Sequence, residues 1–445
     1  MPLLPFLLIL AAQDAGTVEA LHSLGGPSPG SLLGYSMTWV SDHDGDELPD
    51  LFVGAPGVGV RANGAGAAFL FSSKDGQKLL SIMSRTENAR LGSAIAELGD
   101  LTGDGVRDFL LGIPGIVGEG PEQGCVRFVN GKSAQTFNQI TGVQAGEKMG
   151  TSVVVPGDLD GDGTLDFIVG SPGFGGKAGN ECGAVRAFSG RSREMLYEIE
   201  GANRRGQFGQ SLASLPDIDG DQIPDCLVGS LSSGEVTVLS GAFGDVIHVI
   251  KGNPANQFGK AFCSMGDLDG DRVPDYAIGE PLADGEEPGC GKVHIYSGRN
   301  GTILRTIEGA VPDAKLGSSL APLDVGSRNG GPDLLAGAPG KESGGTCVLL
   351  DPLSGALLMN FTGFYEGGEA GHAVVGLNRM DPLGLTPSQA IAKEGALLAF
   401  SAPKAAGSGG ANHGSISFFR WKPSDSDLEE SDAVGGLLAF SATSA

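Results

Sequence analysis

The stretch MGTSVVVPGDLDGDGTLDFIVGSPG, residues 149–173, holds the pattern that decides the fold. It opens with an apolar residue and a glycine, continues as an alternating segment, passes through closely spaced aspartates, and ends in an apolar run with a Gly-x-Pro turn. Alternation and short apolar runs bounded by glycine are typical of β-strands. The stretch therefore predicts two strands joined by an aspartate loop.

Similar stretches recur along the whole chain. The glycines of their opening pairs stand at positions 34, 92, 150, 209, 259, 317 and 371, so successive copies lie 58, 58, 59, 50, 58 and 54 residues apart. Two more strand-like segments follow in most copies, for example GAVRAFSG (183–190) and LYEIEG (196–201). Seven units of four short strands predict an all-β fold, a seven-bladed β-propeller of four-stranded blades.

The two ends of the repeat region fit a closed ring. The seventh unit ends on its third strand, GSISFFRW (414–421), whereas GTVEALHSLGG (16–26) near the N-terminus aligns with the fourth strands of other units. We therefore expect the N-terminal strand to complete the last blade, so that the propeller covers residues 16–421. Closure of this kind removes an exposed sheet edge.

Composition restricts the possible binding partners of the protein and its cellular location. The chain has 445 residues, 76 glycines and a net charge of −24, which argues against nucleic acid as a partner and suits bound cations. No segment is apolar over the length needed to span a bilayer. Residues 1–15 resemble a secretory signal peptide without a basic start, which predicts a secreted, periplasmic or cell-surface protein. Residues 422–445 form an acidic tail that we expect to be disordered.

Six cysteines are scattered along the chain without a C-x-x-C pair. This spacing makes a zinc site improbable and is compatible with fifteen disulfide connectivities, so we predict no particular disulfide. The oligomeric state is left open.

The aspartate loop recurs between the first and second strands of five units, with fixed spacing. Positions 1, 3, 5 and 9 are predicted cation ligands, and the residue at position 7 is expected to add its backbone carbonyl. The predicted ligands are Asp42, Asp44, Asp46, Leu48 and Asp50; Asp100, Thr102, Asp104, Val106 and Asp108; Asp158, Asp160, Asp162, Thr164 and Asp166; Asp217, Asp219, Asp221, Ile223 and Asp225; and Asp267, Asp269, Asp271, Val273 and Asp275.

Oxygen ligands without sulfur or imidazole favour Ca²⁺ or Mg²⁺, and flexible sites rich in carboxylates favour Ca²⁺. The loops therefore predict up to five Ca²⁺ ions, with the second loop the weakest because Thr102 replaces a carboxylate. An EF-hand is excluded, because its position 12 would be Val169, within a predicted strand. The sixth unit retains only Asp324 and Asp333, and the seventh has no site.

Most copies open with an apolar residue and a glycine and end in a Gly-x-Pro turn, with the aspartate loop between them. This pattern resembles the FG-GAP repeat of integrin α-chain propellers and many bacterial extracellular proteins. This resemblance implies adhesion or recognition of a protein or glycan ligand on a rigid, calcium-braced platform. Sequence signatures of a nucleotide-binding loop or a nucleophile elbow are absent, so we expect no catalysis. The alternative is a calcium-dependent polysaccharide lyase or hydrolase, which would need a basic group and a charge-stabilising group clustered at the propeller axis.

Overall fold

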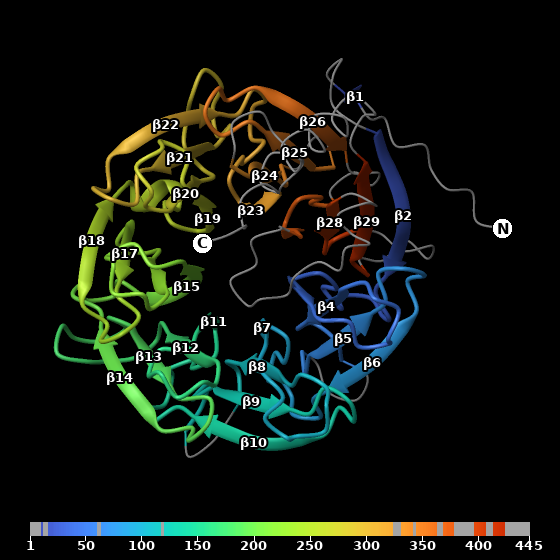
Figure 1. The fold of residues 1–445 in the computed structure, drawn as a ribbon, viewed down its shortest axis with the longest axis vertical. Coiled ribbons are helices and arrows are strands. Elements are labelled where there is room, and N and C mark those ends of the chain that lie inside the picture. Colours follow the sequence, from blue (N-terminus) through green and yellow to red (C-terminus); the bar gives the residue numbers. More distant parts are fainter. Residues whose placement is uncertain are drawn as a thin grey trace, which may run out of the picture.

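Seven antiparallel sheets are arranged around a central axis in the computed structural model (Figure 1). The structure describes residues 10–11, 17–59, 64–116, 120–323, 331–340, 344–362, 368–377, 396–405 and 413–422. The predicted signal peptide and acidic tail lie outside these ranges, apart from Leu10, Ala11 and Lys422. Within the described residues, no helix has the length and apolar character needed to cross a bilayer.

Each sheet is one blade, and its first strand lies nearest the axis (Figure 1). The first three blades consist of β3 (Ser36–Val40), β4 (Asp50–Ala55), β5 (Ala67–Phe71) and β6 (Lys78–Met83); β7 (Ala94–Glu97), β8 (Phe109–Ile113), β9 (Cys125–Val129) and β10 (Thr136–Thr141); and β11 (Ser152–Gly157), β12 (Asp166–Ser171), β13 (Ala184–Phe188) and β14 (Met195–Glu200).

The next three blades follow the same order. They consist of β15 (Phe208–Leu215), β16 (Asp225–Ser230), β17 (Glu235–Leu239) and β18 (Val246–Lys251); β19 (Phe262–Gly266), β20 (Asp275–Glu280), β21 (Lys292–Tyr296) and β22 (Ile303–Glu308); and β23 (Ser319–Leu323), β24 (Asp333–Ala338), β25 (Thr346–Leu350) and β26 (Leu357–Thr362). A short β1 (Leu10–Ala11) pairs with β26, and a single turn of 3-10 helix, η1 (Pro254–Asn256), precedes β19.

The seventh blade joins the two ends of the chain. It contains β27 (Val374–Gly376), β28 (Ala396–Ala402), β29 (Ser415–Lys422) and the N-terminal β2 (Thr17–Gly25). The blue β2 lies beside the red β29 in Figure 1, and the two strands pair antiparallel from Thr17 opposite Lys422 to Gly25 opposite Ser415. The predicted closure is confirmed, and it protects the last edge of blade seven.

The core lies between the blades. Second and third strands are buried along nearly their whole length, as in β4, β12 and β24, because each blade packs both of its faces against its neighbours. Outer strands such as β6 consist mostly of exposed and partly buried residues. All six cysteines are buried with free thiols. Among the described residues, the buried apolar side chains gather in clusters between neighbouring blades, so each blade shares its core with the next.

The paired glycines of the repeat meet where two blades touch. A Cβ atom on Gly112 would lie 2.1 Å from the carbonyl oxygen of Gly150 in the next blade, and Gly150 itself has a left-handed φ of 84°. Only glycine allows both the close approach and this backbone conformation. At four junctions a serine adds a hydrogen bond, as where Ser152 Oγ donates to the carbonyl of Gly209 at 2.7 Å. The other three donors are Ser36, Ser211 and Ser319.

Candidate metal centres

Five aspartate loops connect first to second strands and therefore open on the same face of the propeller. In each loop the position-1 aspartate organises the backbone: Asp158 accepts hydrogen bonds from the N–H groups of Gly161, Asp162 and Gly163, at 2.7, 3.2 and 2.7 Å. Position 4 is a glycine with positive φ, for example Gly161 at 77°. Hydrogen bonds to the position-1 aspartate and the backbone conformation of the position-4 glycine therefore hold this turn.

The position-9 aspartates are fully buried; four of them begin the second strand of their blade, and Asp108 directly precedes β8. Asp166 accepts from the N–H groups of Leu159 and Asp160, and from Gly190 of the turn between β13 and β14 at 2.8 Å. Burial, together with the neighbouring loop carboxylates, raises the pKa of Asp225 to about 7 and that of Asp50 to about 8. A nearby positive charge stabilises the ionised form of buried carboxyl groups such as these.

Four loops bring carboxylate oxygens together. Three ligand oxygens lie within 4.8 Å of one another in the first, third, fourth and fifth loops. The sets are Asp42, Asp44 and Asp50; Asp158, Asp160 and Asp166; Asp217, Asp219 and Asp225; and Asp267, Asp269 and Asp271. Position 5 is thus outside the set in three loops, and position 9 in the fifth.

The position-7 residues Leu48, Val106, Thr164, Ile223 and Val273 all donate their N–H to the position-5 aspartate, at 2.7 to 3.0 Å. They belong to the loops as predicted. The contribution of their carbonyl oxygens to a cation stays a prediction.

The first loop contains a buried carboxylate oxygen that a cation could pair with. Oδ1 of Asp50 is buried and has no hydrogen-bond partner, whereas the matching oxygen in the other four loops accepts a glycine N–H from the turn after the third strand. In the first blade Ser73 takes the place of that glycine. An unpaired buried carboxylate oxygen beside Asp42 and Asp44 is suited to a hard cation.

The second loop does not fit. The amide nitrogen of Asn130, which directly follows β9, donates to Asp104 Oδ2 at 2.6 Å and to Thr102 Oγ1 at 2.9 Å. This amide holds the pKa of Asp104 below its ordinary value. A hydrogen-bond donor therefore occupies the side of the loop to which positions 3 and 5 point, and a cation would be repelled from it.

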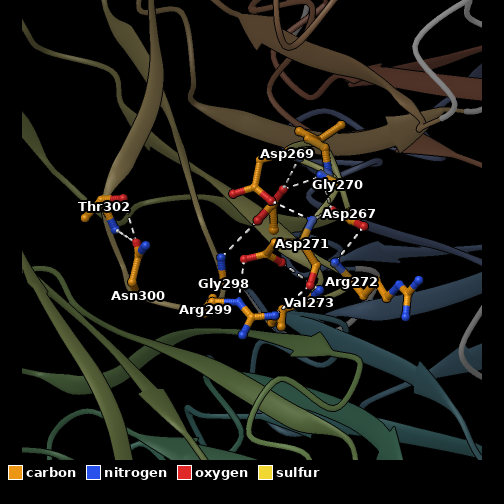
Figure 2. Close-up of polar contacts among 12 residues, drawn as sticks. Asp267, Asp269, Gly270, Asp271, Arg272, Val273, Gly298, Arg299, Asn300 and Thr302 are labelled. Atoms are coloured by element: carbon orange, nitrogen blue, oxygen red, sulfur yellow. Dashed lines mark hydrogen bonds and ion pairs between the residues drawn. The ribbon is translucent and has the colours of Figure 1, made fainter.

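Residues after the third strand also touch the loops, and the sequence reasoning missed them. Figure 2 shows Arg299 of the β21–β22 turn against Asp271 of the fifth loop, with Nε 2.8 Å from Oδ2. The backbone N–H of Val273 and this guanidinium hold the pKa of Asp271 low. The signal was present as a repeated register, SSK, NGK, SGR, SGA and SGR, directly after each third strand.

The sixth and seventh blades could be tested only in part. Asp324 and the rest of the sixth-blade loop up to residue 330 lie outside the described residues, as do residues 378–395 of the seventh. Asp333 is buried at the start of β24, in the same place as the position-9 aspartates.

The axis holds an apolar cavity of about 450 Å³ formed by the first strands of all seven blades. Among the described residues that line it, such as Met37, Val154 and Phe262, Glu97 is the one charged residue, and none is Lys, Arg, Tyr or His. Glu97 is only 2% exposed. Its Oε1 accepts hydrogen bonds from Ser41 and interacts with His43. The cluster expected of a lyase is not found in this described lining.

Comparisons with known proteins agree with the repeat and the fold. Residues 100–169, which contain the second and third loops, match the model of the FG-GAP-like repeat. The chain is 32% identical over 235 residues to integrin alpha pat-2 of Caenorhabditis elegans, covering 47% of this chain and 18% of that protein. It is 31% identical over 215 residues to integrin alpha-V of Gallus gallus, covering 45% and 20%.

Integrin alpha-PS2 of Drosophila melanogaster is 28% identical over 229 residues, covering 47% of this chain and 16% of that protein. The matched region thus spans no more than about a fifth of these relatives. The chain is a seven-bladed propeller that matches the FG-GAP-like repeat over residues 100–169 and is similar over nearly half its length to integrin α chains.

Proposed function

We propose that this protein is a non-catalytic, extracellular, calcium-binding propeller that serves as an adhesion or recognition module for a protein or glycan ligand. The observation that carries the proposal is the convergence of three carboxylates in each of four loops, all in the same position of their blades. Likeness to integrin α chains supports a role in recognition.

Calcium is the cation that suits these loops best. Each loop offers carboxylate oxygens from several residues on an exposed turn, and Ca²⁺ accepts six to eight oxygen ligands in flexible geometry. Mg²⁺ demands near-ideal octahedral geometry and retains more water. A bound ion would stabilise the charged form of the buried position-9 aspartates, such as Asp50 and Asp225, whose burial otherwise opposes ionisation.

Export is part of the same proposal, because residues 1–15 resemble a signal peptide. N-terminal sequencing of the protein recovered from the medium or periplasm should show a start near residue 16. A mature protein that retains Met1 and remains in the cytoplasm would contradict export.

The test is thermal unfolding of chelator-treated protein across a calcium titration, with magnesium in parallel. Each ion that binds only the folded state adds about 2.7 kcal/mol at a hundred times its dissociation constant, so calcium should raise the Tm strongly. Asp160→Asn and Asp219→Asn, which remove charge at exposed position-3 sites, should reduce this rise. The matched control Thr102→Asn, at the same position of the second loop, should leave it unchanged.

Ligand recognition is tested separately on an array of glycans and matrix proteins, with calcium and with chelator. Binding that requires calcium supports a braced recognition platform. If calcium and magnesium have equal, small effects on the Tm, the loops are turns and the cation sites do not exist. If purified protein degrades an uronic-acid polysaccharide in calcium, the lyase alternative replaces the proposal.

A further inference from the structure

A basic side chain from the same blade reaches position 5 of the aspartate loop in three blades. Lys74 Nζ lies 3.9 Å from Asp46 in the first loop, and Arg191 Nε lies 3.5 Å from Asp162 in the third. Arg299 Nε lies 2.8 Å from Asp271 in the fifth. The three basic residues occupy the same place, the second residue after the serine that follows the third strand. Position 5 therefore has a positively charged neighbour built into the blade.

The basic side chain contacts its aspartate loop more closely in some blades than in others. In the fifth loop Arg299 also donates through Nη2 to the backbone carbonyl of Asp271 at 2.6 Å, so it holds both the carboxylate and a carbonyl (Figure 2). In the third loop Arg191 Nε forms the ion pair with Asp162 and also donates a hydrogen bond to Thr164 Oγ1 at 3.2 Å. In the first loop the exposed Lys74 makes only a long ion pair.

The fourth loop has no such neighbour, because Ala242 occupies the matching position. Every residue of this loop and of the turn after β17 is described, and no Lys or Arg there forms an ion pair with Asp217, Asp219, Asp221 or Asp225. Among the described residues, the carboxylates of the fourth loop thus form no ion pair with a Lys or Arg side chain.

We propose that the basic residue of this turn is a built-in counter-ion that sets the calcium affinity of each loop, which is highest in the fourth loop and lowest, among the four fitted loops, in the fifth. The inference rests on the proposed calcium sites. A guanidinium at position 5 offsets repulsion among the carboxylates when no metal is bound, and it repels a divalent cation that enters. Unit charges about 4 Å apart in water interact by about 1 kcal/mol, which corresponds to roughly a fivefold change in affinity per loop.

Exchanging the residues tests the proposal. Ala242→Arg should weaken the tightest calcium site about fivefold, and Arg299→Ala should tighten the fifth-loop site by a similar factor. Ala242→Gln and Arg299→Gln are the matched controls, because they provide a long polar side chain without charge. Calcium affinities are measured by isothermal titration calorimetry on chelator-treated protein, with all variants at the same low ionic strength.

Thermal unfolding without metal gives an independent measurement. Ala242→Arg should raise the metal-free Tm above that of Ala242→Gln, and this advantage should vanish in saturating calcium. Equal affinities and equal metal-free Tm values for Ala242→Arg and Ala242→Gln would overturn the counter-ion role while leaving the calcium sites intact. No calcium binding by the parent protein would instead be a failure of the sites themselves, and the counter-ion role would fall with them.

Discussion

The second and third loops have the same backbone and differ in what their side chains do. Asp100 and Asp158 each accept hydrogen bonds from three loop N–H groups. The third loop gathers three carboxylates, whereas in the second an amide from Asn130 bonds Asp104 and Thr102. Hydrogen bonds to the position-1 aspartate therefore hold the same turn in both loops. We expect the residues at position 3 and directly after the third strand to decide whether a cation can bind.

The largest expected effect tests what the two loops share. Asp166 and Asp108 are fully buried, and each accepts three backbone N–H groups, including one from the turn after the third strand. Asp166→Ala and Asp108→Ala leave these donors unpaired, so each should lower the free energy of unfolding by about 3 kcal/mol. Urea denaturation without calcium measures the loss.

The control for these two variants is Asp160→Asn, because Asp160 is exposed and its carboxylate accepts only one loop N–H, from Asp162. It should change metal-free stability little. A large loss in Asp166→Ala together with an unchanged Asp108→Ala would show that the backbone of the second loop is held in some other way.

An exchange of side chains tests what the two loops do not share. Thr102→Asp combined with Asn130→Ser gives the second loop the side chains found in the third, where Asp160 and Ser189 stand. The double variant should bind one more calcium ion than the parent, worth about 2.7 kcal/mol at a hundred times the dissociation constant. Atomic emission of dialysed protein counts the ions.

The reverse exchange, Asp160→Thr with Ser189→Asn, is the matched control and should remove one ion. If the first double variant gains no ion while the reverse exchange loses one, then Asn130 is not what prevents binding in the second loop.

The smallest expected effect concerns one carboxyl group. Because the Asn130 amide lowers the pKa of Asp104, this interaction contributes stability above the unfolded-state pKa and is lost as the pH falls through the lower folded-state pKa. In Asn130→Ser the pKa of Asp104 should move up toward its ordinary value. Carbon-13 NMR titration of the side-chain carboxyl measures this shift, and an unchanged pKa would mean that the amide does not stabilise the charge.

Much of the fold could be predicted from the repeat alone. The alternation and glycine spacing predicted seven four-stranded blades, and the missing fourth strand at the C-terminal end predicted that residues 16–26 would complete the last blade, as β2 does. The five loops and their position-1 and position-9 aspartates could also be found, because carboxylates at fixed spacing in one turn must lie near one another whatever surrounds them.

The sequence by itself thus determined the blade, the ring closure and the candidate ligands, since all three depend on spacing within a repeat. Only the tertiary structure decided which loops suit a cation. Asn130 and Arg299 lie 26 and 28 residues after the aspartates that they bond, and the sheet returns them to the loop by pairing the second and third strands. The electrostatic environment of a site depends on all the charged and polar groups near it in space, and most of these groups are distant along the chain.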